Sequence, residues 1–130
     1  MKSSVIEGYL KAKGLKPVIS VRKISDNRNQ VTVVLKGLVN EFLDDSKDNR
    51  ETVLQDLRHT GFDDDTNVAT AMTESDFKGF GDFVMKFLEC IEDSDIEDER
   101  ADLKTGDYTI VLTYPNLSWG EVESKFNSEE

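Results

Sequence analysis

Three segments of the chain alternate apolar and polar residues, which is the pattern of strands buried on one face. Residues 17–25 and 30–36 are two of them, and the turn-forming residues 26–29 between them predict a β-hairpin. Residues 107–114 are the third, and Pro115 is expected to end that strand because proline cannot donate to a ladder. The alternation therefore predicts three strands.

Other segments place apolar residues three or four positions apart, so that these residues share one face of a helix. We expect helices in five such segments, at residues 4–13, 38–44, 48–61, 74–91 and 118–126. Thr73 is the expected N-cap of the longest helix, and Ser118 with Glu121 has the spacing of a capping box. The acidic run 92–99 is either a loop or a solvated continuation of the helix before it.

These elements predict the fold class. Three strands cannot close a barrel, so their apolar face needs helices to cover it. We expect an α+β fold in which a small, mostly antiparallel three-stranded sheet, formed by the hairpin and a C-terminal strand, packs with three to five helices. At 130 residues the chain is long enough to bury a core as one globular domain, residues 1–130, with the last few residues frayed.

The composition argues against several function classes. The chain has one cysteine, Cys90, and one histidine, His59, so we expect no disulfide, no metal and no cofactor. It has no apolar run long enough for a membrane span or a signal peptide, which favours a cytoplasmic location. Its paired carboxylates lie mostly in polar runs, without the dry pocket that acid–base catalysis needs. Since no phosphate-binding loop occurs either, we expect a protein that is not an enzyme.

Charge is distributed unevenly along the chain. Residues 1–36 hold eight basic and two acidic residues, a net +6, whereas residues 37–130 hold the other 8 of 16 basic and 25 of 27 acidic residues, a net −17. Such asymmetry indicates something about partners and solubility rather than about the fold. One hypothesis is that a basic patch on the first helix and the hairpin binds nucleic-acid phosphates. Its residues would be Lys11, Lys13, Lys16, Arg22, Lys23 and Arg28.

The acidic segments support a different hypothesis, which we favour. Carboxylates three or four residues apart on a helix are separated by about 5–6 Å, and phosphates along one DNA strand by a distance of the order of 6–7 Å. We therefore expect a protein-interaction module that docks on a basic surface of a nucleic-acid-handling protein, as a DNA-mimic-like inhibitor or adaptor of the phage or mobile-element accessory type. The expected contact residues are Asp44, Asp45, Asp48, Asp63, Asp64, Asp65, Glu92, Asp93, Asp95, Glu97, Asp98 and Glu99.

Two further hypotheses remain open. Asp63, Asp65, Asn67 and Glu74 match positions 1, 3, 5 and 12 of the calcium-binding loop of EF-hand proteins, a resemblance confined to this stretch. Position 6, where that loop needs glycine, is occupied by Val68. The other hypothesis is self-assembly, in which the basic N-terminal third of one copy contacts acidic segments of a neighbour in a homo-oligomer.

Overall fold

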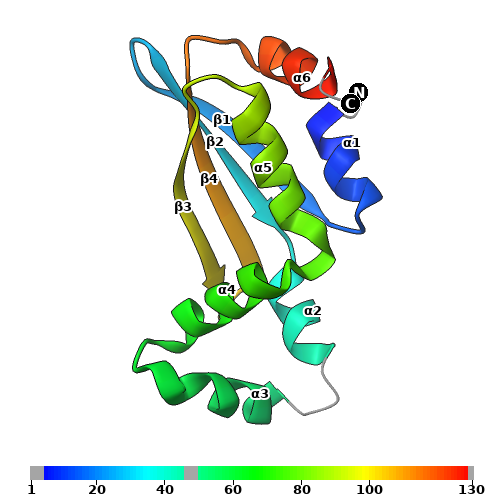
Figure 1. Ribbon diagram of the computed structural model, residues 1–130, viewed down its shortest axis with the longest axis vertical. Helices are drawn as coiled ribbons and strands as arrows, with labels where there is room; N and C mark the ends of the chain where they lie inside the picture. The colour runs from blue at the N-terminus through cyan, green and yellow to red at the C-terminus, as the bar shows by residue number, and fades with distance from the viewer. Residues whose placement is uncertain (1–4, 46–49, 129–130) are drawn as a thin grey trace.

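The computed structural model describes residues 5–45 and 50–128, which form an α+β fold (Figure 1). This fold class confirms the prediction from the sequence. The helices are α1 (Val5–Ala12), α2 (Leu38–Asp44), α3 (Arg50–Leu57), α4 (Asp64–Ser75), α5 (Phe80–Cys90) and α6 (Trp119–Ser128). The strands are β1 (Pro17–Ser25), β2 (Arg28–Leu35), β3 (Asp95–Asp102) and β4 (Asp107–Pro115), and single 3-10 turns cover Arg58–Thr60 and Phe77–Gly79.

The sheet has four strands, so the prediction of a three-stranded sheet is wrong. Its order is β1-β2-β4-β3, and every neighbouring pair is antiparallel. The additional strand is β3, which forms from the acidic segment expected to be a loop or a helix continuation. Its exposed, charged side chains hide the alternation, and pairing with β4 holds the segment extended. Six α-helices in the described ranges also exceed the predicted three to five.

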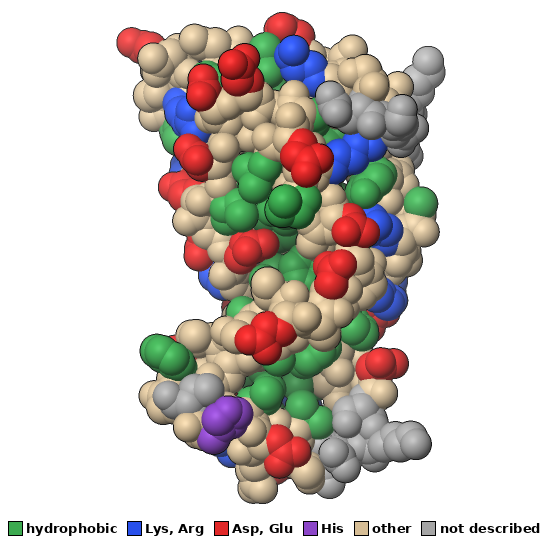
Figure 2. Space-filling view, viewed as in Figure 1, with side chains coloured by type: hydrophobic (Ala, Val, Ile, Leu, Met, Phe, Trp, Pro, Cys, Tyr) green, Lys and Arg blue, Asp and Glu red, His purple; other side chains and the backbone are tan. Residues whose placement is uncertain are grey.

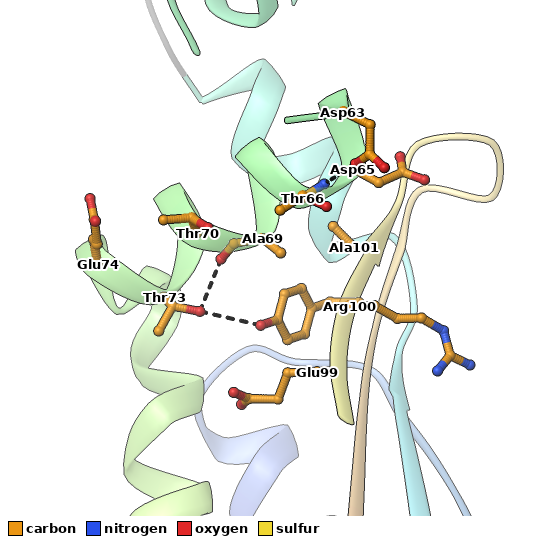
Figure 3. A pocket seen from close by; sticks show the side chains of 11 residues that line it. Asp63, Asp65, Thr66, Ala69, Thr70, Thr73, Glu74, Glu99, Arg100 and Ala101 are labelled. Carbon is orange, nitrogen blue, oxygen red and sulfur yellow. Dashed lines mark hydrogen bonds between the residues drawn. The ribbon is translucent and has the colours of Figure 1, made fainter. Parts of the chain in front are cut away.

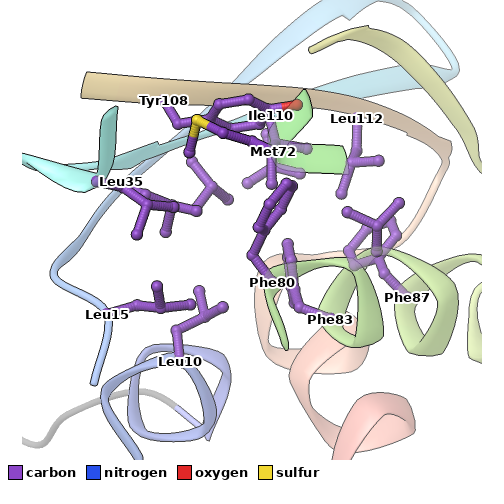
Figure 4. Close-up of a cluster of buried hydrophobic side chains, with 14 of the residues drawn as sticks. Leu10, Leu15, Leu35, Met72, Phe80, Phe83, Phe87, Tyr108, Ile110 and Leu112 are labelled. Carbon is purple, nitrogen blue, oxygen red and sulfur yellow. The ribbon is translucent and has the colours of Figure 1, made fainter. Parts of the chain in front are cut away.

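The main core lies between one face of the sheet and helices α1, α5 and α6 (Figure 1). Phe83 and Phe87 of α5 and Phe126 of α6 are fully buried. The Phe87 ring lies 6.1 Å from that of Tyr114 on β4, and Figure 4 shows further α5 side chains facing Ile110 of the same strand. Burial of a large apolar side chain is worth about 1.5–3 kcal/mol, so this layer accounts for most of the apolar stabilisation.

Helices α2, α3 and α4 lie together beyond one end of the sheet (Figure 1). The turn between β3 and β4 anchors α2, because the Gly106 carbonyl accepts hydrogen bonds from the backbone N–H groups of Val39 (3.0 Å) and Asn40 (3.4 Å). Gly106 has φ +80°, and a Cβ there would overlap the Asn40 side-chain amide. Glycine is therefore required where α2 meets the sheet.

The predicted helix at 74–91 is interrupted. Asp76, Lys78 and Gly79 all have positive φ, so the chain turns sharply between α4 and α5. Thr73 lies inside α4, where its hydroxyl donates to the Ala69 carbonyl, and the prediction that it caps the next helix is wrong. Helix α5, which lies within the predicted span, has Gly79 as its N-cap. Most of helix α4 was not predicted, and its N-cap is Asp63, whose side chain accepts from the Thr66 N–H.

Several local predictions are confirmed. The hairpin pairs Val18 with Val34 and Val21 with Val31. The capping box at α6 is reciprocal, since the Ser118 hydroxyl accepts from the Glu121 N–H at 3.1 Å and the Glu121 carboxylate accepts from the Ser118 N–H at 3.2 Å. Strand β4 is buried on both faces from Asp107 to Tyr114, because it lies between two other strands.

Candidate functional site

Two acidic segments that are far apart in the sequence lie side by side. The Leu103 N–H, just after β3, donates to the Asp65 carboxylate of α4 at 3.1 Å. A cleft of about 440 Å³ separates α4 from β3, and Figure 3 shows its lining. Carboxylates line it on both sides, from Asp63, Asp65 and Glu74 and from Glu99 across the cleft.

The N-terminal end of α4 uses its three aspartates differently. The hydrogen bond from the Thr66 N–H (2.7 Å) holds the pKa of Asp63 below its usual value. Asp64 forms two hydrogen bonds with the Arg58 guanidinium, at 2.9 and 2.8 Å, which lowers the pKa of Asp64 and raises that of Arg58. Asp64 is therefore neutralised within the chain, whereas Asp63 and Asp65 accept hydrogen bonds from the uncharged backbone N–H groups of Thr66 and Leu103.

Strand β3 is the acidic outer edge of the sheet. It carries five acids and one arginine, a net −4, namely Asp95, Glu97, Asp98, Glu99, Asp102 and Arg100. The register shifts between Ile96 and Asp98, which marks Glu97 as a bulge residue. Two of the acids are paired, Asp95 with Arg28 at 3.2 Å and Asp98 with Arg100. Acid clusters and bulges are both devices that keep an edge strand from pairing with another chain.

Glu99 differs from the other acids of β3 because it lies on the helix-covered side. It pairs with the buried Ile110, and Figure 3 shows its carboxylate directed towards the cleft while Arg100 points away from it. Burial, followed by repulsion from Asp98, raises the pKa of Glu99. Beside it, the hydroxyls of Thr73 and Tyr108 lie 3.3 Å apart, and burial raises the pKa of Tyr108. The cleft is thus polar and negative, with one desolvated carboxylate.

The other predicted acidic residues are not all part of this surface. Asp44 and Asp45 line a separate hollow with Glu41 and Lys78, and Asp48 lies outside the described residues. Glu92 and Asp93 are exposed in the turn before β3. Figure 2 shows separate acidic side chains around apolar ones on the helix-covered side, so acidity also occurs away from β3. The structure therefore joins 63–65 with residues 99–103 at the end of β3 and leaves 44–45 apart.

The predicted basic residues do not form one patch. Lys11 pairs with Glu7 at 2.8 Å, and Lys13 pairs with Asp82 at 3.4 Å. Arg28 pairs with Asp95 at the far edge of the sheet. The remaining three lie on or just before β1, at Lys16, Arg22 and Lys23, and the described residues form no ion pair with them. The basic residues thus divide between α1, the sheet face and the β1 edge.

The stretch that resembles a calcium-binding loop is helical. Residues Asp64–Ser75 form α4, so the sharp turn that an EF-hand loop makes is absent from this stretch. Asn67 is buried and its amide donates to the Phe62 carbonyl. No group of three or more His, Cys, Asp or Glu side chains that could hold a metal ion occurs within 5–45 and 50–128. Val68, where the loop would need glycine, is fully buried in the core instead.

Phe62 is a surface residue that the sequence analysis did not single out. It lies directly before Asp63, and 67% of its surface is exposed. The sequence contains a weak signal for it, since Phe62 stands between Gly61 and three aspartates, outside any periodic apolar face. A hollow lined by Phe62, Leu57 and His59 adjoins it. An exposed aromatic ring next to the acidic cleft provides apolar contact area there.

Comparison with known proteins found no relative of this chain. No family model, no curated protein and no solved structure matches the chain. Within the described part of the chain, none of the helices has the length and apolar character needed to cross a membrane.

Proposed function

We propose that the protein is a non-enzymatic protein-interaction module that docks on a basic surface of a nucleic-acid-handling protein, as a DNA-mimic-like inhibitor or adaptor. The observation that carries this proposal is the juxtaposition of α4 and β3, linked by the Asp65–Leu103 hydrogen bond. It brings the acidic start of α4 beside the acidic edge strand β3, through residues 38 positions apart in the sequence. A cytoplasmic site of action follows from such a partner.

The carboxylates of β3 support the proposal through their charge. Residues two apart along a strand are separated by about 6.6 Å, close to the phosphate spacing of the order of 6–7 Å along one DNA strand. In strand β3 the bulge at Glu97 interrupts this spacing, and Glu99 lies on the helix-covered side. The acids on the other side of this edge include Asp95, Asp98 and Asp102. The proposal therefore draws on the density of negative charge along β3 rather than on a regular, phosphate-like distance.

Phe62 supplies the local contact that charge alone does not. Long-range attraction between charged surfaces raises the association rate, but affinity depends on a few well-packed anchors, often aromatic. Phe62 is exposed and adjoins Asp63 at the mouth of the acidic cleft. In this proposal the acids of α4 and β3 guide the partner and Phe62 inserts into its surface.

Direct nucleic-acid binding is less well supported. A sheet that binds single strands presents aromatic side chains on its open face, where bases stack. The hollow on the open face here, of about 590 Å³, is lined by Ser20, Val21, Arg22, Gln30, Thr32, Glu97, Asp98, Arg100 and Val111, without an aromatic residue among them. Tyr108 and Tyr114 of β4 face the core.

The test is capture of partners on the immobilised protein from a lysate of the cell that encodes it. We expect captured proteins to be released by added duplex DNA and by NaCl raised to about 0.5 M, because both compete for charge on a basic surface. A variant with Asp63→Ser, Glu97→Lys and Asp98→Lys should capture none of them. Serine preserves the helix cap while it removes the charge.

A control variant separates this surface from net charge. Asp44→Ser, Asp45→Lys and Glu89→Lys change three exposed acids by the same total charge, away from the cleft. The control should capture the same proteins as the wild type. The proposal would be contradicted if both variants lost capture to the same extent. It would also be contradicted if duplex DNA did not displace the captured proteins.

A further inference from the structure

Strand β1 is the other outer edge of the sheet, and half of its backbone groups are unpaired by β2. The Lys36 N–H donates to the Lys16 carbonyl at 2.9 Å, just before the strand. In an antiparallel ladder, residues that bond to the partner alternate with residues that bond outwards. Lys16 bonds to the partner strand, so every second residue after it along the regular register also bonds to β2. Ile19, Val21 and Lys23 are the residues in between, and their backbone groups point away from β2.

This edge is less strongly charged than β3, since it carries the two cations Arg22 and Lys23 where β3 carries five acids. Strand β1 contains no acidic residue, and its register shift lies only at the hairpin end, between Lys23 and Ser25. Three apolar side chains of β1 are exposed, with exposed fractions of 55% for Val18, 40% for Val21 and 43% for Ile24. A regular, partly apolar edge strand is a template onto which another extended chain adds.

Charge selects the kind of strand that fits. Lys16, Arg22 and Lys23 are exposed along this edge, and none of them has an ion pair with a described residue. The Arg22 guanidinium donates to the neutral Gln30 side chain, at 2.7 Å. Opposite charges on facing strands stabilise a pair, and like charges destabilise it. An acidic strand therefore complements β1, whereas a second copy of β1 would bring cations together.

We propose that β1 is a docking strand for an extended acidic segment of a partner protein, which adds to the sheet as a fifth strand. Main-chain hydrogen bonds to Ile19, Val21 and Lys23 supply affinity, and Arg22 and Lys23 supply the preference for acids. The site goes beyond the proposed function, since it lies at the opposite edge of the sheet from the acidic surface.

The test uses a labelled peptide that alternates Glu and Val over nine positions, the length of β1, and a second peptide with Lys in place of Glu. Fluorescence anisotropy at low ionic strength should show binding of the Glu peptide and binding at least about tenfold weaker for the Lys peptide. Val21→Pro should weaken Glu-peptide binding by at least about tenfold, because proline removes an outward N–H that the β2 ladder does not use. Arg22→Glu with Lys23→Glu should weaken it similarly and carries the test if Val21→Pro does not fold.

The matched control is Lys104→Glu with Lys125→Glu, which makes the same charge change at exposed lysines away from β1 and should bind as the wild type does. The acidic-surface variant Asp63→Ser, Glu97→Lys, Asp98→Lys should also bind the peptide, so failure of the proposed function is distinguishable. Equal binding of the two peptides, or unchanged binding by folded Val21→Pro, overturns the proposal. So does sedimentation that shows self-association through β1 while the Glu peptide stays unbound.

Discussion

The two outer strands of the sheet occupy equivalent positions and have opposite chemistry. A single row crosses the helix-covered face from Ile19 on β1, through Val33 and Ile110, to Glu99 on β3. Both end residues are half-buried, but Ile19 adds to the apolar core, whereas burial raises the pKa of Glu99. The side chains of β1 thus stabilise its place in the sheet, whereas β3 is held there mainly by backbone hydrogen bonds to β4. The same position in a sheet does not require the same source of stability.

The largest expected effect is to open a cavity at the centre of this row. Ile110 on β4 is fully buried, so Ile110→Ala should lower the free energy of unfolding by about 2–5 kcal/mol through lost burial and a cavity. Urea denaturation measures this change. The control is Ile24→Ala on exposed β1, expected to change stability by at most about 0.5 kcal/mol. Comparable losses at the two positions would show that the buried centre of the row does not contribute more stability than its exposed edge.

An intermediate loss of stability is expected from replacing Asp107, a carboxylate bonded within the fold, unlike the solvated acids of β3. The Asp107 carboxylate, at the start of β4, accepts hydrogen bonds from Lys36 Nζ at 2.7 Å and the Gly37 N–H at 2.8 Å. Burial opposes its ionisation, but these bonds outweigh burial and lower the pKa of Asp107. Asp107→Ala should therefore cost about 1–3 kcal/mol at neutral pH.

The pH dependence of Asp107→Ala follows from the sign of its shift. A carboxyl with a lowered pKa in the folded protein stabilises it above the ordinary value of 3.8, and that contribution is lost as the pH falls through the folded value. The difference in stability between wild type and variant should therefore shrink in acid. A difference that stays constant below pH 3.8 would assign the loss to packing rather than to charge.

The smallest expected effect on stability comes from exchanging the residue types at the two ends of the row, Ile19 and Glu99. Because the pKa of Glu99 is raised, its ionised form destabilises the fold above its folded pKa and not below the ordinary value of 4.5. Glu99→Ile should raise the thermal midpoint at neutral pH, with a gain that becomes smaller towards pH 4.5, where only the added apolar contact of isoleucine remains. The reverse change, Ile19→Glu, should lower stability by about 1 kcal/mol. Glu92→Gln, which removes an exposed acid, is the control for net charge.

The elements that the sequence predicts are those whose signal is local. The hairpin and β4 alternate clearly, and the Ser118–Glu121 capping box needs only four consecutive residues. Strand β3 is different, because its extended form depends on pairing with β4 and its side chains are mostly solvated. The start of α4 at Asp63 resembles a loop in sequence, since three consecutive aspartates favour turns as well as helix starts.

The candidate surface was predictable in its chemistry but not in its arrangement. The sequence identifies residues 63–65 and 92–99 as acidic, yet only the fold places the Asp65 carboxylate on the Leu103 N–H. Asp44 and Asp45 share that chemistry and lie by another hollow. Phe62 escapes prediction because exposure, not residue type, distinguishes it from the core phenylalanines.

The order of strands in the sheet constrains how the chain folds during synthesis. Strand β4 lies between β2 and β3 in the sheet but follows both in the chain, and it pairs Pro115 with Arg28. The β1–β2 hairpin can therefore form early. The other edge of β2 stays unpaired until the ribosome has made most of the chain, including β4. Helix α1 can make its native contacts only later still, because the Ile6 N–H donates to Glu123 of α6 at 3.0 Å. Most of the acidic residues between β2 and β4 are made in this interval, and we expect their mutual repulsion to oppose pairing between incomplete chains through the open edge of β2.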